Sequence, residues 1–416
     1  MSRNAELERI ATRRDVLTTG SAFLWSGALA GCASQSSPSD ATSAATDGQI
    51  DTETSSRTDT TASEPASYDA SMAPMGEVEF DEPPERVFTV FPQYADMAVA
   101  LGHGETVNAV YVPEMSGTTM NHYYDRLDGV SFEWEGLEDP LSDGLDEEHL
   151  LALDSDVHLA DPAWASTQNN WNQSDVETIR ETQGPWFGNF YSGTQADPPA
   201  AYADQYEYYT LWELFGHVAE VFQEQARYEA LDQVHSDLID TITENLPPKE
   251  ERPTAVRVTL SDEAFWTYHL NRPGYWLADT RPLGATDAFA ETEWGQLWGQ
   301  VGYEAMAEAD PDVILHLWGM TPNYDMAEVR NTLESSEVGQ QLSAVQNDRV
   351  YPQGMRYQGP IMNLFQLEMT AKQLYPDIFG EWPDYEDGAP YPKLPADEQL
   401  FDRSRVASII TGDETA

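Results

Sequence analysis

Short apolar runs alternate with amphipathic stretches over the first part of the folded chain. Residues 87–91 form an apolar run typical of a strand. The stretch that follows places its apolar side chains on one helical face, at Tyr94, Met97, Ala98 and Leu101. A second strand is predicted at residues 107–112, after Gly102 ends the helix. Strand, helix and strand with tight connections predict a βαβ unit and hence a parallel sheet.

The same alternation recurs further along the chain. Residues 147–153 predict a helix, and residues 157–160 predict a strand. In the second half, RPTAVRVTL predicts a strand, and EAMAEADPDVILHLW predicts a helix, a turn and a strand over residues 313–317. This recurrence predicts a second α/β unit beyond the first.

One long helix is predicted between the two units. Its apolar or aromatic positions follow the helical period, at Phe222, Ala226, Leu231, Val234, Leu238 and Ile242. At a rise of about 1.5 Å per residue, such a helix is roughly 30 Å long. Because the folded part of the chain is longer than a single core usually holds, we predict an α/β fold with two lobes, 77–221 and 247–405. The interlobe helix spans 222–246, and a tail, 406–416, follows. Because a single rigid helix connects the lobes, we expect them to move only a little relative to each other.

The first 32 residues are typical of an export signal. Arg13 and Arg14 precede an uncharged segment, residues 17–30, which is too short for the roughly 20 apolar residues of a membrane span. Paired arginines before a short apolar region indicate the twin-arginine export route. The sequence LAGC, which ends at Cys32, resembles a lipobox, in which the cysteine receives a lipid and becomes the new N-terminus.

Cys32 is the only cysteine of the chain, so an intramolecular disulfide and a cysteine-based metal cage are excluded. A buried free cysteine is the alternative, but neither a strand nor an amphipathic helix is predicted around it. We therefore expect Cys32 to anchor the exported protein on the outer face of the cytoplasmic membrane. Residues 33–76 consist mainly of small polar, acidic and proline residues, and we predict that they form a disordered tether.

The net charge of the chain indicates the solvent in which the protein works more than the ligand that it binds. The chain has 73 acidic residues against 21 lysines and arginines, for a net charge of −52. Such a surface repels phosphates, which excludes nucleic acid as a partner. Since 40% of the residues are hydrophobic, the chain can still fold. We expect a halophilic protein, because concentrated salt screens this self-repulsion, and any single pair of carboxylates is weak evidence for catalysis.

Four stretches of the sequence carry a resemblance to a known family. They are PERVFTVFPQYADMAVALG, GLDEEHLLALDSDV, WGQVGYEAMAEADPDVIL and LSAVQNDRVYPQGMRYQGPIMNLFQLEMTAKQLYPDIF. Their order and spacing resemble the helical-backbone substrate-binding proteins of ABC importers for ferric siderophores and cobalamin, over most of residues 77–380. This resemblance implies two Rossmann-like lobes joined by one helix, with the ligand in a cleft between them. The stretches 115–143 and 164–197 are longer and more polar than the family pattern.

The resemblance also implies two docking positions for a permease. In this family one acidic residue on each lobe contacts arginine pockets of the permease, and the matching positions here are Glu148 and Glu304. Each is predicted to open a helix, where the helix dipole favours an exposed carboxylate. The alternative is that both are ordinary acids at helix N-termini. The implied partners are an ABC permease with its ATPase, a small molecule and the membrane, and we expect a monomer.

Ligands of open parallel sheets bind beyond the carboxyl ends of the strands, so the segments after each predicted strand are candidates. Aromatic side chains are frequent there, at Tyr94, Trp164, Trp186, Tyr191, Trp266, Tyr268, Trp318 and Tyr357. Three arginines lie near them in the sequence, Arg272, Arg281 and Arg356. Each of these arginines can bind an anionic ligand or form an internal salt bridge, and for any single ring packing in the core is the more common role. As a group they suit a flat, conjugated ligand.

Other classes of site have less support. No two histidines are four residues apart, although His269 and His316 could serve as ligands for a bare metal ion. No nucleophile or nucleotide motif follows a predicted strand, so we expect no enzyme. A hydrolase with a carboxylate pair, for instance Asp262 with Glu263, is the alternative, but in so acidic a chain such a pair is weak evidence. Asn172 begins an N-glycosylation sequon.

We therefore expect the exported solute-binding component of an ABC importer that captures a ferric chelate of the siderophore type. No cofactor is expected, because the iron arrives as part of the chelate. A corrinoid or haem is the alternative ligand. The alternative of another class is an adhesive or sensory surface lipoprotein, which predicts no companion permease and ATPase.

Overall fold

The structure, a computed structural model, describes residues 67–261 and 264–413. The described residues all belong to one compact unit of the chain, residues 63–416. The export signal, Cys32 and the pair Asp262 and Glu263 lie outside the described residues. No helix within the described ranges is both long enough and apolar enough to cross a membrane.

The first lobe contains the parallel sheet that the sequence predicts. β3 (Val87–Thr89) lies between β4 (Val107–Ala109) and β5 (Val157–Leu159), and both pairings are parallel. The central strand is buried along its whole length, as expected for a sheet covered on both faces. The helices of this lobe are α2 (Pro92–Ala100), α3 (Pro113–Tyr124), α4 (Glu147–Leu153), α5 (Pro162–Ala165), α6 (Gln173–Thr182) and α7 (Leu211–Phe222). The predicted βαβ unit is therefore present.

A β-hairpin precedes this sheet and overlaps the predicted tether. β1 (Tyr68–Met72) pairs antiparallel with β2 (Gly76–Phe80), so a strand forms inside residues 33–76. Ala70 and Met72 are buried at alternate positions, and the ring of Tyr68 stacks on Phe80 at 5.6 Å between centroids. The alternation of apolar and polar residues in β1 is short and lies in a polar segment, so the sequence did not predict this strand. The predicted end of the tether is therefore wrong for residues 68–76.

The second lobe contains a larger sheet that is only partly parallel. The strand order is β11-β10-β6-β7-β9. β8 pairs with the first two residues of β6, whereas β7 pairs with the later part of that strand. β6, β8, β10 and β11 are parallel to one another, whereas β7 and β9 run antiparallel to their neighbours. The bounds are β6 (Thr254–Ser261), β7 (Ala264–Tyr268), β8 (Thr286–Asp287), β9 (Trp298–Val301), β10 (Val313–His316) and β11 (Val350–Pro352).

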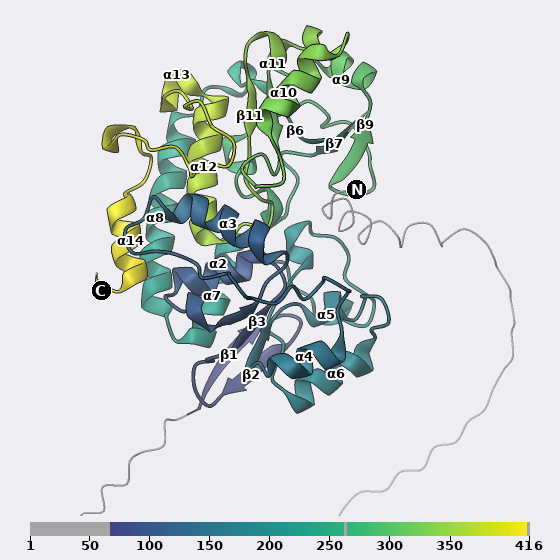
Figure 1. Cartoon of the computed structure of the whole chain (residues 1–416), viewed down its shortest axis with the longest axis vertical. Helices are drawn as coiled ribbons and strands as arrows, with labels where there is room; N and C mark the ends of the chain where they lie inside the picture. The colour runs from purple at the N-terminus through teal and green to yellow at the C-terminus, as the bar shows by residue number, and fades with distance from the viewer. Residues whose placement is uncertain (1–66, 262–263, 414–416) are drawn as a thin grey trace, which may run out of the picture. The chain divides into compact units, whose positions relative to one another are not determined.

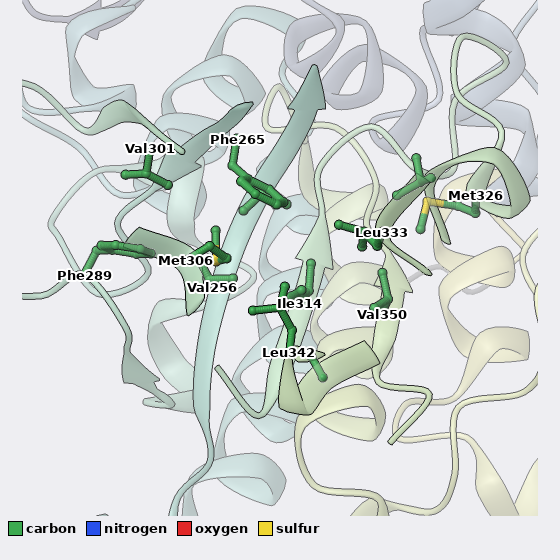
Figure 2. Close-up of a cluster of buried hydrophobic side chains, with 13 residues drawn as sticks. Val256, Phe265, Phe289, Val301, Met306, Ile314, Met326, Leu333, Leu342 and Val350 are labelled. Carbon is green, nitrogen blue, oxygen red and sulfur yellow. The ribbon is translucent and has the colours of Figure 1, made fainter. Parts of the chain in front are cut away.

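One face of this second sheet carries an apolar core (Figure 2). Side chains of the strands meet those of α9 (Tyr303–Ala309) and α10 (Met326–Ser335), and the loop before α11 (Ser343–Gln346) closes one end. The central members are Val256, Phe265, Met306, Ile314, Leu333 and Val350. Since the helices occupy this face, Tyr268 and Trp266, which alternate with Phe265 along β7, project from the opposite face.

The long connecting helix is α8 (Gln225–Asn245), and its apolar stripe is buried at Leu231, Val234, Leu238 and Ile242. The predicted start at Phe222 differs, because Phe222 ends α7 and Gln223 takes a left-handed conformation that separates the two helices. α12 (Pro360–Leu374) runs beside α8 and packs against α2 and α3 of the first lobe (Figure 1). α13 (Pro376–Phe379) and α14 (Arg403–Thr411) follow. The segment predicted as the second lobe therefore ends in helices that return to the first.

Candidate ligand-binding site

Three aromatic rings of the first lobe gather at the carboxyl ends of its strands. Phe91 directly precedes α2, Trp164 lies in α5 and Phe190 follows the loop after α6. The ring of Phe91 lies 5.1 Å from that of Trp164 and 5.0 Å from that of Phe190, between centroids. Asp161 holds this arrangement together, because its Oδ1 accepts from the N–H of Ala163 and its Oδ2 accepts from the N–H of Phe190.

Two rings of the second lobe meet this group across the junction between the lobes. Tyr357, which follows β11, lies 4.9 Å from Phe91, and Trp276, in the 3₁₀ turn Tyr275–Leu277, lies 5.7 Å from Phe190. Trp276 and Tyr357 contact each other edge to face at 5.3 Å. We call these five residues, Phe91, Trp164, Phe190, Trp276 and Tyr357, the interlobe aromatic cluster. It fills the junction where the sequence predicted a cleft.

Arg356 lies beside this cluster inside a cage of aromatic rings. Its guanidinium carbon lies between 4.5 and 5.9 Å from the centroids of five rings, which define the Arg356 cage: Tyr268, Trp276, Trp298, Trp318 and Tyr357. The guanidinium also donates to the hydroxyls of Tyr268, at 3.3 Å, and Tyr357, at 3.0 Å. The residue is only 3% exposed. Cation–π attraction stabilises the charge of an arginine in such surroundings.

A buried ion pair fixes the two segments that carry the second lobe's rings. The Nη2 of Arg257 lies 2.7 Å from the Oδ2 of Asp279, and both side chains are almost fully buried. Arg257 also donates to the carbonyl of Trp276, and Asp279 accepts from the side chain of Gln358. Because Gln358 directly follows Tyr357, the pair positions Trp276 and Tyr357 relative to each other.

Two glycines allow the lobes to approach closely. A Cβ at Gly274, in the second lobe, would lie 2.4 Å from the carbonyl oxygen of Gly193 in the first lobe. A Cβ at Gly193 would lie 2.5 Å from the Nε1 of Trp276. Gly274 also has a φ of 118° and a ψ of 145°, which is open to glycine alone. The sequence thus places its smallest residues where the backbones meet.

Two buried acids of the first lobe lie close to the junction. Burial raises the pKa of Asp161 to about 6, although its hydrogen bonds to Tyr206 and backbone N–H groups act in the opposite direction. Burial also raises the pKa of Asp96 to about 7. Asp96 accepts from the hydroxyl of Tyr124 and from the N–H of Met362, and so it caps the N-terminus of α12 from α2.

Several of the predicted ligand residues come together at this junction. Trp164 and Tyr357 belong to the interlobe aromatic cluster, and Tyr268, Trp318 and Arg356 belong to the cage. Tyr191 lies edge to face against Phe190 at 5.6 Å. The members that the sequence prediction missed are Phe91, Phe190, Trp276 and Trp298.

The other predicted ligand residues have other surroundings. Trp186 packs against His158 at 4.9 Å and donates its N–H to the carbonyl of Val176, inside the first lobe. Tyr94 is buried, and its hydroxyl accepts from the N–H of Asn189 at 2.7 Å. Trp266 is partly exposed on β7.

The two remaining arginines differ in burial. The guanidinium of Arg272 is exposed and lies 3.7 Å from the carboxylate of Glu293, which describes a surface ion pair. Arg281 is partly buried, which lowers its pKa, and its Nη1 is 3.5 Å from the carbonyl of Gly274. Arg281 is therefore the nearer of the two to the contact between the lobes.

The predicted docking acids are exposed in the first turns of their helices. Glu148 lies in α4 and Glu304 in α9, as the sequence predicts. Asn172 is also exposed, where its side chain accepts from the N–H of Ser174 and caps α6. All three side chains are accessible to a partner or a modifying enzyme.

The two histidines considered as metal ligands have separate partners. The Nε2 of His316 accepts from the N–H of Leu260, and burial lowers the pKa of His316 to about 4. The Nδ1 of His269 lies 3.2 Å from the carboxylate of Asp287. Within residues 67–261 and 264–413, no group of three or more histidine, cysteine or acidic side chains is arranged to hold a metal ion.

An open depression lies elsewhere, on the surface of the second lobe beside α10. Its lining is mostly small and polar: Tyr303, Asp325, Ala327, Glu328, Asn331, Thr332, Ser335 and Ser336. Among the described residues, those that line it include one aromatic ring and no basic side chain. The interlobe junction, with its rings and its arginine, is the better candidate for binding a conjugated anion.

Comparison with known proteins agrees with this two-lobe arrangement. A family model described as a periplasmic binding protein matches residues 87–354. Among solved structures, the chain is similar to a periplasmic binding protein from Veillonella parvula, at 17% identity over 77% of this chain and 95% of that chain, with a TM-score of 0.53. It is also similar to the iron uptake ABC transporter substrate-binding protein PiuA from Streptococcus pneumoniae, at 15% identity over 74% and 98%, with a TM-score of 0.51. The heme binding protein HmuT gives 16% identity over 75% and 90%, with a TM-score of 0.50. At these identities the likeness shows the fold alone, and a search of the curated proteins finds no match.

Proposed function

The chain belongs to the periplasmic binding protein family, and from this premise we propose that it is the solute-binding component of an ABC importer that captures a ferric chelate. Family membership implies a solute-binding protein that works outside the cytoplasm. The ligand class, the permease partner and the lipid anchor belong to the proposal.

The Arg356 cage beside the interlobe aromatic cluster is the observation that carries the ligand class. Rings from both lobes meet there, and they provide flat apolar surfaces for a conjugated ligand. Arg356 adds a buried positive charge next to those surfaces. A carboxylate or a catecholate on the ligand would form charge-assisted hydrogen bonds with such a group. The combination favours an anionic, conjugated chelate.

The names of two similar proteins of known structure support the same class. One is an iron uptake substrate-binding protein, and the other is a heme binding protein. We therefore keep a haem or a corrinoid as the alternative ligand. The iron would arrive inside its chelator, so the protein itself would need no resident metal or cofactor.

Titration of the chain from residue 33 onward, in molar salt, tests the ligand class. We would follow tryptophan fluorescence with ferric catecholates, ferric hydroxamates, ferric citrate, haem, cobalamin and free metal ions. Saturable quenching by one iron chelate, absent for its iron-free form, is the expected result. If the protein is folded and no ligand of the panel quenches its fluorescence, the proposal is contradicted and a non-transport surface role is favoured.

Arg356→Ala is the site-directed test of the same proposal. Removing the charge should weaken binding of an anionic chelate by about tenfold or more, because a hydrogen bond to a charged group is lost. Arg272→Ala is the matched control, since Arg272 is an exposed arginine of the same lobe. Equal affinities for both variants would remove Arg356 from the site.

We further propose that Glu148 and Glu304 dock the loaded protein onto its permease. Both are exposed, and each opens a helix on a different lobe. Reversing both charges to arginine should abolish uptake and leave ligand affinity unchanged. The same change at Glu229 and Glu244, which are exposed on α8, is the control and should leave uptake intact. Unimpaired uptake in the first variant would refute the assignment.

The proposal places the mature protein at the membrane through a lipid on Cys32. The Cys32→Ala variant should then appear in the soluble exported fraction, where the unmodified chain is membrane-bound. A variant that stays entirely in the membrane fraction would show that another element anchors the protein. A companion permease and ATPase encoded nearby would separate the importer from an adhesive or sensory surface protein.

A further inference from the structure

We propose that the indole N–H groups of Trp276 and Trp298 are ligand donors that recognise an oxyanion on the captured chelate. This inference rests on the proposed function and deepens it, because it names two recognition groups and the chemical feature that they read. It arises from two indole N–H donors that have no acceptor among the described residues.

Both indoles are buried, yet neither N–H has a hydrogen-bond acceptor in the part of the chain that the structure describes. Trp276 is 2% exposed and Trp298 is 4% exposed, and within the described residues the Nε1 of each has no partner. Other tryptophans of the chain do find acceptors: Trp171 donates to the carbonyl of Leu145, Trp186 to that of Val176 and Trp212 to the side chain of Asn363. A buried donor without an acceptor is costly, so an unused one needs an explanation.

The two indoles belong to the same part of the site. Their ring centroids lie 6.0 Å apart with the planes inclined by 30°, and the guanidinium carbon of Arg356 lies 4.5 Å from the ring of Trp276 and 5.4 Å from that of Trp298. Arginine and indole side chains offer donors and no acceptors. Three donor-bearing side chains therefore lie in one part of the junction, and the complementary ligand group is an acceptor, best a negatively charged oxygen.

The surroundings of Trp276 explain how the donor can be both covered and available. Its Nε1 faces Gly193 of the first lobe so closely that a Cβ there would lie 2.5 Å away. Glycine has no side chain to accept a hydrogen bond. Because this cover comes from the other lobe, separating the lobes uncovers the N–H, and a ligand oxygen bound between them satisfies it.

The feature recognised is thus an oxyanion attached to a conjugated body. Two sources carry this chemistry: the catecholate oxygens of a ferric catecholate and the carboxylates of haem. A ferric hydroxamate also presents iron-bound oxygens, but three hydroxamates only neutralise Fe³⁺, whereas three catecholates leave the complex negatively charged. A neutral ferric hydroxamate without a carboxylate therefore serves as the contrasting ligand.

Isothermal titration of the full chain tests the inference with three variants. Trp276→Phe and Trp298→Phe keep an aromatic ring and remove the N–H. Trp382→Phe is the matched control, because the Nε1 of Trp382 is also buried without a partner among the described residues, but its ring packs on Tyr391. Ferric catecholate, haem and the contrasting ferric hydroxamate are the three ligand arms.

We expect Trp276→Phe and Trp298→Phe each to weaken binding of one oxyanion-bearing ligand by about tenfold or more, and Trp382→Phe to leave it unchanged. The arm that shows the loss identifies the source of the oxyanion. Thermal unfolding without ligand should change no more than in Trp382→Phe, since no hydrogen bond is lost. A purely structural role would lower stability and leave affinity alone.

If the unmodified chain binds and both Trp276→Phe and Trp298→Phe keep its affinity, this inference is overturned and the proposed function stands. An unmodified chain that binds no ligand of the panel would overturn both. If a phenylalanine variant fails to fold, benzothienylalanine at the same position retains the two-ring shape without the N–H. The same loss of affinity is then expected, and its absence would overturn the inference.

Discussion

Gly274 offers a sharp test of how the two lobes meet, because alanine there should force them apart. The new Cβ would lie 2.4 Å from the carbonyl oxygen of Gly193 and 2.9 Å from the Cα of Thr194. These are backbone atoms of the other lobe, which cannot rotate away. Relief to ordinary contact distance requires a shift of about 1 Å between the lobes at this point.

The magnitude follows from two contributions. The conformation of Gly274, with φ of 118° and ψ of 145°, is strained for any other residue and costs about 1–3 kcal/mol. Forcing an extra methyl group into a packed contact costs about 1–3 kcal/mol more. The sum is comparable to the free energy that holds a local contact closed, so we expect Gly274→Ala to open the junction while the two sheets stay folded.

Hydrogen exchange with mass spectrometry would measure this opening. Peptides covering residues 189–194 and 274–278 should lose protection in Gly274→Ala, while peptides covering β3 and β10 should not. Gly144→Ala is the matched control, since Gly144 has a φ of 93° and open space at its Cβ position. If Gly274→Ala exchanges at the junction like the unmodified chain, the close approach of the lobes is not a constraint and the reasoning fails.

Three further predictions concern buried charge and salt. Burial raises the pKa of Asp96 from 3.8 to about 7, so the folded protein keeps a proton that the unfolded chain loses, and the free energy of unfolding should fall by up to about 4 kcal/mol between pH 4 and pH 7. Urea unfolding of Asp96→Asn should lack this decline, and parallel curves for both proteins would contradict it. Asp279→Ala leaves the guanidinium of Arg257 buried and unpaired, which should cost about 3–5 kcal/mol, whereas Asp154→Ala breaks an exposed pair and should change stability little. Because the net charge is −52, molar sodium chloride should raise the midpoint of thermal unfolding, and equal midpoints in low and high salt would argue against salt adaptation.

The regular elements with a clear period were predictable from the sequence. The helix at residues 147–153 and the strand at 157–160 agree with α4 and β5 within one residue, because apolar spacing decides both. The antiparallel part of the second sheet was not predicted. The sequence predicts Phe265–Tyr268 as a segment that follows a strand, although Ala264–Tyr268 pairs back on β6 as β7. The pairing of β7 with β9 joins residues that no local spacing relates.

The same limit explains which members of the site were missed. Tyr268, Trp318 and Arg356 follow predicted strands, so the rule that ligands bind beyond strand ends identified them. Trp298 lies on β9, whose place beside β7 depends on a long-range pairing. Trp276 lies in a turn beside Gly274, and its importance depends on the first lobe covering it. A glycine next to two aromatic residues, as in PGYW, was the available signal of a close approach.

The contrast between the surface and the junction indicates how this protein would select an anionic ligand. A chain with a net charge of −52 repels anions at long range, and only concentrated salt reduces that repulsion to a Debye length of about 3 Å. Steering by the overall field therefore cannot favour an anionic chelate, and discrimination has to come from contacts made after the ligand arrives. The Arg356 cage meets that requirement, because the charge of Arg356 is enclosed by rings that exclude water and is 3% exposed. Salt screens a buried charge far less than an exposed one. The interaction that would bind the ligand thus persists under the same conditions that allow the ligand to approach.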